Sequence, residues 1–150
     1  MMEIGSSDLP QAALDRIRDS FARQGLMSLL GAELAEAKAG LVTIRLPFKP
    51  DLTQQHGYFH AGGTASIADS AGGYAGFTLM PGDSSVLTVE FKLNLINPAQ
   101  GDFLEATGRV IKPGRTLTVC QLDVWGVAPA RRVHVATGLQ TLICVQGKPA

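Results

Sequence analysis

The chain has 150 residues, of which 45% are hydrophobic and 17% are charged. These proportions are typical of a globular domain with a buried core and exclude a disordered chain. Thirteen basic and thirteen acidic residues cancel, so no overall field attracts nucleic acid or an anionic membrane. We therefore expect a single domain spanning residues 1–150 with neither of those partners.

Cysteine usage and the N-terminal sequence indicate the compartment. Cys120 and Cys144 show no metal-ligand spacing and lie in alternating apolar runs, which favours buried free thiols over a zinc site or a disulfide. The start MMEIGSSDLP lacks the pattern of a secretory signal, and no apolar run reaches the roughly 18 residues that span a bilayer. A cytoplasmic protein without a metal site is expected.

The sequence pattern of residues 1–30 predicts a helical segment. Asp8 is a candidate N-cap, Pro10 suits the first turn, and Gly25 is expected to end the helix. The apolar residues recur at helical spacing, at Leu14, Ile17 and Phe21.

An antiparallel hairpin is expected next. Ala39-Gly40 predicts its turn, with residues 32–37 as the first strand. The second strand shows the two-residue alternation of apolar side chains, at Val42, Ile44, Leu46 and Phe48. A polar stretch covers residues 49–60.

Residues 61–80 are almost all small or apolar. The glycines in this segment each lower helix propensity by about 1 kcal/mol. Even so, a 3.6-residue repeat is formed by Ile67, Ser70 or Ala71, Tyr74, and Phe77 or Thr78. Because small residues allow close approach of neighbouring backbone, we predict a helix that is buried on most sides and terminated by Pro81-Gly82.

The remaining sequence predicts strands at 87–95, 103–111, 116–127 and 132–145, in antiparallel succession. A helix, two strands, a buried helix and four strands are typical of an α+β fold with an antiparallel sheet wrapped around a long central helix. A helix lying on a flat sheet is the alternative, but the near absence of charge in residues 61–80 favours wrapping.

Asp69 is the single charged residue between Ala61 and Met80. An unpaired buried carboxylate costs several kcal/mol, so stability alone does not explain it. Asp69 could face a polar interface or cap a backbone group, or it could be catalytic.

The start of this helix offers a second clue. Gly62 lies seven residues before Asp69, and two helical turns place both on one face. The N–H groups of Gly62 and Gly63 lack partners within the helix and can bind a polarised carbonyl oxygen. His60 precedes this turn, either as a helix cap or solvated loop residue, or as part of a site.

These residues carry a family resemblance. The run from Gln54 to Gly63, followed by Ile67-Ala68-Asp69, resembles the signature of hotdog-fold acyl-CoA thioesterases of the PaaI-like, phenylacetate-degradation branch. The resemblance continues from Thr88 to Ala99 and through the hairpin from Val110 to Thr116, and it covers residues 31–144. It implies the hotdog fold and an acyl-CoA thioesterase.

The resemblance also implies roles. Asp69 would be the nucleophile or the base that activates water, with that choice left open, and the Gly62 N–H would polarise the thioester carbonyl. His60 and Gln54 would orient the thioester or the water. Thr88, from the other subunit of a homodimer, would hold the water beside Asp69. Two dimers could pair as a homotetramer.

Two positions depart from the family pattern. Ala61 replaces the first glycine of His-Gly-Gly but keeps its N–H, and Gln54 stands where asparagine is more usual. Ala61 and Gly63 are expected to contact the substrate. Coenzyme A enters as part of the substrate, so no cofactor is implied, and its phosphates need cations. Those cations are expected to come from Lys92, Lys112 and Arg115.

Two other functions compete. A hotdog hydratase would place a histidine beside a Phe-Pro-Gly run, or an Asp/His pair in a loop, and neither is present. A non-catalytic acyl-CoA-binding domain needs no buried carboxylate, so Asp69 argues against it. The acyl group stays open, although an aryl or short-to-medium chain is expected from the candidate pocket residues Tyr58, Phe59, Tyr74 and Phe77.

Overall fold

The computed structural model describes residues 4–148, which form a six-stranded antiparallel sheet and three α-helices. The sheet order is β1-β2-β4-β5-β6-β3. The helices are α1 (Gln11–Ala22), α2 (Gly25–Leu30) and α3 (Ala61–Phe77), with a short 3-10 helix at Pro50–Leu52. The strands are β1 (Glu33–Lys38), β2 (Leu41–Pro47), β3 (Ser84–Leu95), β4 (Phe103–Lys112), β5 (Leu117–Ala128) and β6 (Arg131–Gln146).

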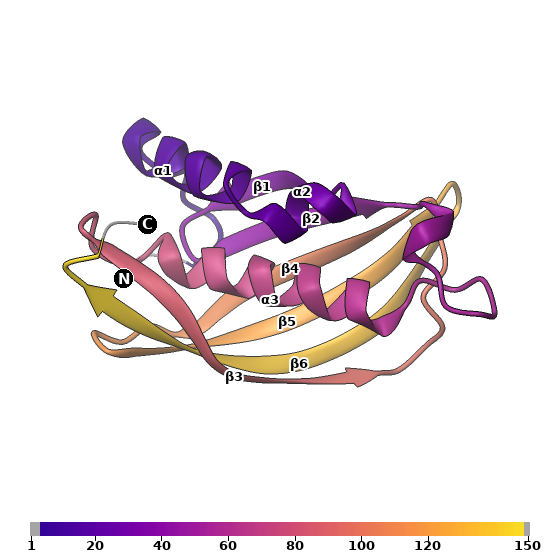
Figure 1. Ribbon diagram of the computed structural model, residues 1–150. Coiled ribbons are helices and arrows are strands. Elements are labelled where there is room, and N and C mark those ends of the chain that lie inside the picture. The colour runs from indigo at the N-terminus through magenta and orange to yellow at the C-terminus, as the bar shows by residue number, and fades with distance from the viewer. Residues whose placement is uncertain (1–3, 149–150) are drawn as a thin grey trace.

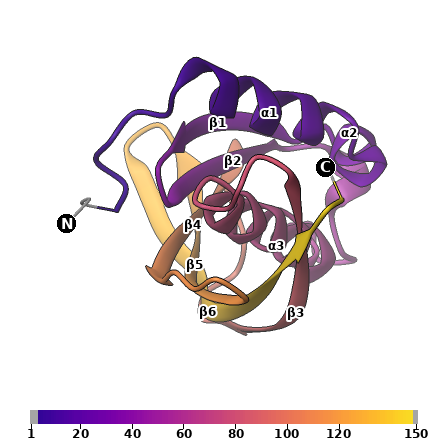
Figure 2. The same cartoon turned by 90° about the vertical axis from the view of Figure 1, so that its left-hand side faces the viewer.

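The sheet curls around α3, as predicted from its small, apolar sequence. Figure 1 shows α3 lying along the concave face of the strands, and the end-on view of Figure 2 shows strands on several sides of it. Ile67, Ala71, Ala75 and Phe77 have no exposed surface. The flat-sheet alternative is therefore wrong.

Close packing of α3 on β4 requires glycine at the contact. A Cβ atom built on Gly108 would collide with the backbone of Gly72 and Ala71. Backbone therefore meets backbone here, and the helix propensity lost at Gly72 is offset by packing density. This contact explains why the glycine-rich segment is a helix.

The predicted β1–β2 hairpin is confirmed. Ala37 pairs with Val42 and Lys38 with Leu41, and Gly40 occupies the turn with a φ of 75°. This left-handed conformation favours glycine. The predicted inner face of β2 is also confirmed up to Leu46, whereas Phe48 lies beyond the strand and is 46% exposed.

The N-terminal helix forms, but its predicted boundaries are wrong. Pro10 is the N-cap of α1, with no side-chain hydrogen bond, so Asp8 does not cap it. The helix ends at Ala22, and Gly25 starts α2 rather than stopping α1. α1 packs over the end of α3, where Arg16 donates hydrogen bonds to the carbonyl oxygens of Phe77 and Pro81.

The last four strands form close to their predicted bounds, but β3 pairs with β6 at the edge of the sheet rather than with β4. One side of β3 therefore lacks a partner strand in the described chain. Several of the alternating apolar residues of β3 are exposed, at Leu87, Val89, Phe91 and Leu95.

The two cysteines are free thiols, as predicted. Cys120 is fully buried, and this burial raises the pKa of its thiol to about 12, whereas Cys144 is half-buried. Within residues 4–148, no three His, Cys, Asp or Glu side chains gather in a way that could hold a metal ion. None of the described helices is long and apolar enough to cross a membrane.

Gly108→Ala tests the packing of α3. The methyl group meets backbone that cannot rotate away, so we expect the free energy of unfolding to fall by about 1–3 kcal/mol or more. Denaturant unfolding measures the change. Gly25→Ala is the matched control because a Cβ there meets nothing within 4 Å, and equal stability of the two variants would contradict the packing argument.

Candidate active site

Asp69 lies on the side of α3 that the sheet leaves open. Ser66, Asp69 and Gly73 are each partly exposed, while the residues between Asp69 and Gly73 are buried. This three- or four-residue spacing marks a single helix face. The sequence predicted a buried carboxylate, but that of Asp69 is only partly buried, because no strand crosses this face.

Two neutral donors hold the carboxylate of Asp69. Thr88 Oγ1 donates to Asp69 Oδ1 at 2.7 Å, and Gln140 Nε2 donates to the same oxygen at 2.7 Å. None of the salt bridges among residues 4–148 includes Asp69. Because both side-chain hydrogen bonds converge on Oδ1, Oδ2 is left without a side-chain partner in the described chain.

Thr88 contacts Asp69 of its own chain. The expectation that the other subunit supplies this threonine is therefore wrong. The reason is topological: β3 pairs with β6 at the sheet edge and runs beside the open face of α3.

Gln140 was missed in the sequence. It is 1% exposed and lies on β6, on the same side of the strand as the buried Ala136 and Leu142. A long polar side chain at an inward position of an otherwise apolar strand is a signal that could have identified it, because buried polar groups need partners.

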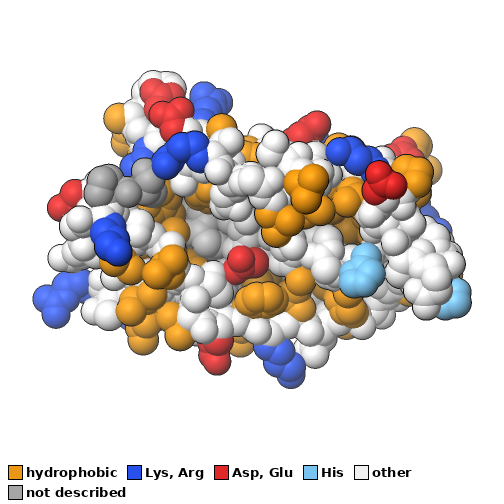
Figure 3. Space-filling view, viewed as in Figure 1, with side chains coloured by type: hydrophobic (Ala, Val, Ile, Leu, Met, Phe, Trp, Pro, Cys, Tyr) orange, Lys and Arg blue, Asp and Glu red, His pale blue; other side chains and the backbone are white. Residues whose placement is uncertain are grey.

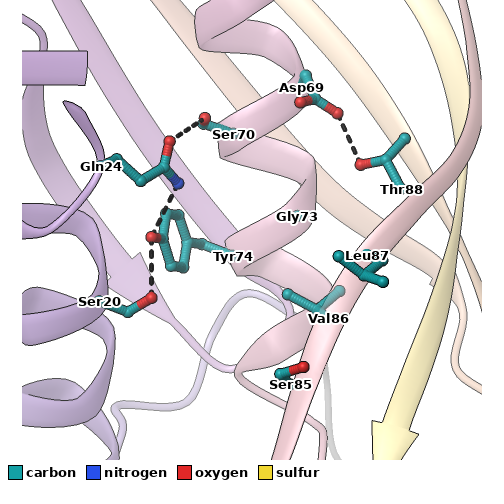
Figure 4. Close-up of a pocket in the computed structure, with 10 residues that line it drawn as sticks. All are labelled: Ser20, Gln24, Asp69, Ser70, Gly73, Tyr74, Ser85, Val86, Leu87 and Thr88. Carbon is teal, nitrogen blue, oxygen red and sulfur yellow. Dashed lines mark hydrogen bonds between the residues drawn. The ribbon is translucent and has the colours of Figure 1, made fainter. Parts of the chain in front are cut away.

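A cavity of about 420 Å³ opens beside Asp69. Figure 4 shows Asp69 and Thr88 at one end and polar side chains of the N-terminal helical region at the other. Gln24 Nε2 donates to Tyr74 Oη at 2.9 Å, and Ser20 Oγ lies 3.1 Å from the same hydroxyl. Val86, Leu87 and the ring of Tyr74 supply apolar parts of the cavity lining.

His60 caps α3. Its Nδ1 accepts a hydrogen bond from the Gly62 N–H at 2.7 Å, which matches the helix-cap alternative. The neutral imidazole then carries its proton on Nε2, because Nδ1 acts as the acceptor. The Gly62 N–H, predicted to polarise a carbonyl, is occupied by this cap, while the Gly63 N–H donates to the carbonyl oxygen of His60.

Gln54 lies with this turn in a second cavity of about 470 Å³. Its Oε1 accepts from the His56 N–H at 2.5 Å, closing its own loop. Tyr58, Phe59, His60 and Ala61 also line this cavity. Of the four aromatic residues considered for an acyl pocket, Phe77 has no exposed surface and belongs to the core.

The predicted site residues therefore form two groups within one chain. Asp69 and Thr88 line one cavity, and Gln54, His60 and Ala61 line the other. Seven residues of straight helix separate Gly62 from Asp69 by about 10 Å. A single thioester group cannot contact both groups in one chain, because its carbonyl oxygen and carbon are directly bonded.

The three predicted phosphate-binding cations are exposed, but they do not lie together. Lys92 is on β3, whereas Lys112 ends β4 and Arg115 lies in the turn before β5. Arg115 lines a small cavity with Leu79 and Pro81. Lys112 and Arg115 are thus at the C-terminal end of α3, away from His60.

Figure 3 shows the open face of the molecule, which is hollowed along α3. Hydrophobic side chains gather along the borders of this hollow, over β3 and around α2. The exposed large apolar residues of these elements are Leu26, Leu29, Leu87, Val89, Phe91 and Leu95. An apolar surface of this kind is typical of an interaction site.

Sequence comparison relates the chain to hydrolases. Residues 56–129 match the family model of the Thioesterase superfamily. A candidate esterase of Halobacterium salinarum is 32% identical over 111 residues, which cover 71% of this chain and 72% of that protein.

Solved structures agree. A thioesterase family protein from Silicibacter pomeroyi is 43% identical with a TM-score of 0.88, covering 90% of this chain and 99% of that one. The Escherichia coli PaaI protein of the phenylacetic acid degradation operon shares the fold at 18% identity, with a TM-score of 0.84 and coverage of 95% and 100%. The family match, the sequence identity and the shared fold show that this chain belongs to the thioesterase superfamily, as a thioester hydrolase with the hotdog fold.

Proposed function

We propose that the protein hydrolyses aryl or short-to-medium-chain acyl-CoA to the free acid and coenzyme A, with Asp69 as the catalytic carboxylate. The observation that carries this proposal is the environment of Asp69. Its carboxylate borders a cavity, forms no salt bridge with a described residue, and has Oδ1 held by Thr88 and Gln140. Oδ2 is left to react.

Asp69 Oδ2 can act in two ways. As a base, it takes a proton from water while the water oxygen bonds to the thioester carbon, and the tetrahedral intermediate then expels the thiolate, which recovers the proton. As a nucleophile, Oδ2 bonds to that carbon and expels the thiolate, leaving an anhydride that water hydrolyses. Both routes need a donor for the developing oxyanion.

The turn that begins α3 is the proposed oxyanion site. With His60 Nδ1 occupied by the cap, the neutral ring presents its Nε2–H outward, and the Ala61 N–H lies at the positive end of the helix. The Gly62 N–H is engaged by His60 Nδ1 in this arrangement, and it would be an alternative donor to the His60 ring if that hydrogen bond were exchanged for one to the oxyanion. Gln54 borders the same cavity and would orient the thioester or the water.

A second copy of the chain would complete the site. The outer edge of β3 has no partner strand in the described chain and carries the exposed Leu87 and Val89, as an edge strand awaiting a partner would. A twofold axis beside β3 and perpendicular to α3 would make the two α3 helices of the dimer antiparallel. The His60 turn of one chain then approaches Asp69 of the other. Two such dimers would form the proposed homotetramer.

The cavity beside Asp69 is the proposed acyl site. Its volume of about 420 Å³ lies near the lower end of the range for ligand sites. Val86, Leu87 and the Tyr74 ring supply apolar walls, which favour an aryl group or a short-to-medium chain. Lys92, Lys112 and Arg115 remain the proposed contacts of the coenzyme A phosphates, because their cations are exposed and can pair with a phosphate.

Asp69→Asn tests the catalytic carboxylate. The amide cannot take a proton or attack, so we expect kcat to fall about 10²–10⁴-fold, measured as free thiol released from acyl-CoA, while coenzyme A still binds. The exposed Asp51 gives the control Asp51→Asn, which is expected to keep parental kcat. Hydrolysis by Asp69→Asn at the parental rate would overturn the proposed mechanism.

A panel of acyl-CoA esters tests the acyl site. We expect higher kcat/KM for aryl and short-to-medium esters than for palmitoyl-CoA, because a cavity of about 420 Å³ holds a small group. A preference for palmitoyl-CoA would contradict this assignment. Hydration of an enoyl-CoA without thiol release would instead support the hydratase alternative.

Mixing two impaired variants tests whether the site is shared. In a heterodimer of Asp69→Asn and His60→Ala chains, one site carries both substitutions and the other carries neither. Random exchange makes half the dimers mixed, so about a quarter of parental activity should return. Activity is measured after subunit exchange, with heterodimer content checked by native mass spectrometry. If heterodimers form and activity does not return, each chain holds its own site.

A further inference from the structure

Gln140 is a long polar side chain inside the apolar core. Its neighbours two residues away on the same side of β6, Gly138 and Leu142, provide no hydrogen-bonding side chain. Gln140 is 1% exposed, so its amide has no access to bulk water. Every hydrogen bond that it makes must come from the protein.

The Gln140 amide nitrogen is directed at the proposed catalytic carboxylate. Nε2 lies 2.7 Å from Asp69 Oδ1, 3.1 Å from the Asp69 carbonyl oxygen and 3.1 Å from Thr88 Oγ1. These acceptors fix the orientation of the amide, since a flipped Gln140 would place its carbonyl oxygen against the carboxylate.

Gln140 also orients the second donor. Thr88 Oγ1 accepts from Gln140 Nε2, and its own proton is therefore directed to Asp69 Oδ1. The Thr88 hydroxyl accepts one hydrogen bond and donates the next, so the bond from Gln140 strengthens the bond from Thr88 to Asp69. Thr88 is exposed on an edge strand, so the buried Gln140 is the more rigid of the two supports.

This arrangement has a cost in stability. Gln140 Oε1 is buried and has no hydrogen-bond partner among the described residues, and such a group costs roughly 1–3 kcal/mol. Gly72 leaves the space for it, because a Cβ on Gly72 would collide with Oε1. An apolar side chain at position 140 would avoid this cost, so stability does not account for the glutamine.

We propose that Gln140 is a positioning residue for Asp69. By donating to Oδ1 from the buried face of β6, Gln140 fixes the rotation of the Asp69 carboxylate. Oδ2 is then directed to the thioester carbon or the attacking water. Gln140 contacts neither of them itself. This inference rests on the proposed function, in which Asp69 is the catalytic group.

Gln140→Met is the main test, because methionine has a similar length and lacks the amide protons. We expect kcat on the best acyl-CoA ester to fall about 10²-fold, as a misdirected reacting group does, with KM unchanged within about twofold because the residue does not touch the substrate. The melting temperature should stay the same or rise, since the unpaired Oε1 is removed.

Gln121→Met is the matched control. Gln121 is half-buried on β5 and donates to Thr137 Oγ1 and the Leu122 carbonyl oxygen, with no bond to Asp69. Its kcat should equal that of the parent. Parental kcat in Gln140→Met would overturn the proposal, as would a loss of kcat that Gln121→Met reproduces or that a fall in melting temperature accompanies.

Gly72→Ala provides a second route if Gln140→Met does not fold. Its methyl group collides with the Gln140 amide and with Leu122, so some stability is lost. Measured well below the melting temperature, kcat should still fall with unchanged KM, whereas parental kcat would contradict the proposal. Asp69→Asn, assayed alongside, separates the two claims. If Asp69→Asn is inactive and Gln140→Met is fully active, the positioning role fails alone; if Asp69→Asn is fully active, the proposed function fails with it.

Discussion

The rigidity of α3 is the constraint on which the rest of this structure depends. The sheet packs so closely on the helix that Gly72 and Gly108 contact each other through backbone atoms. Because of this dense packing, α3 cannot bend to bring its N-terminal turn closer to Asp69. The distance between the turn at His60 and the carboxylate of Asp69 is therefore fixed by helical rise. The same packing leaves one face of α3 uncovered, and Asp69 lies on that face.

The positions of the His60 turn and of Asp69 along α3 determine which chemistry one chain can perform. Hydrolysis of a thioester needs a donor at the carbonyl oxygen and a carboxylate at the carbonyl carbon, and these two substrate atoms are directly bonded. One chain holds these groups about 10 Å apart, and the exposed apolar residues of β3 supply a surface on which a second chain could bring them together. The support of Asp69 by Thr88 and Gln140, in contrast, lies entirely within one chain. The fold thus orients the carboxylate by itself, and in the proposed dimer the partner chain would supply the oxyanion donor.

Much of the fold could be predicted from the sequence because its signals are local. Alternation identified the strands, and the glycine-rich repeat at residues 61–80 identified the buried helix. Asp69 was noticed because charge is rare there. The failures concern contacts between distant segments: pairing of β3 with β6 placed Thr88 beside Asp69 of the same chain, and Gln140 reaches Asp69 across 71 residues of sequence. Asp8 and Gly25 failed for a different reason, since Pro10 and a second short helix overrode their usual capping preferences.

In the proposed dimer, Asp69 of one chain and the His60 turn of the other act on the same thioester. A crystal structure with a non-hydrolysable acyl-CoA analogue tests it most directly. We expect the carbon that replaces the thioester carbon to lie within contact distance of Asp69 Oδ2 in one chain, with its carbonyl oxygen hydrogen-bonded at the turn from His60 to Gly62 of the partner. An analogue whose carbonyl group lies away from Asp69, or whose contacts all come from one chain, would contradict it.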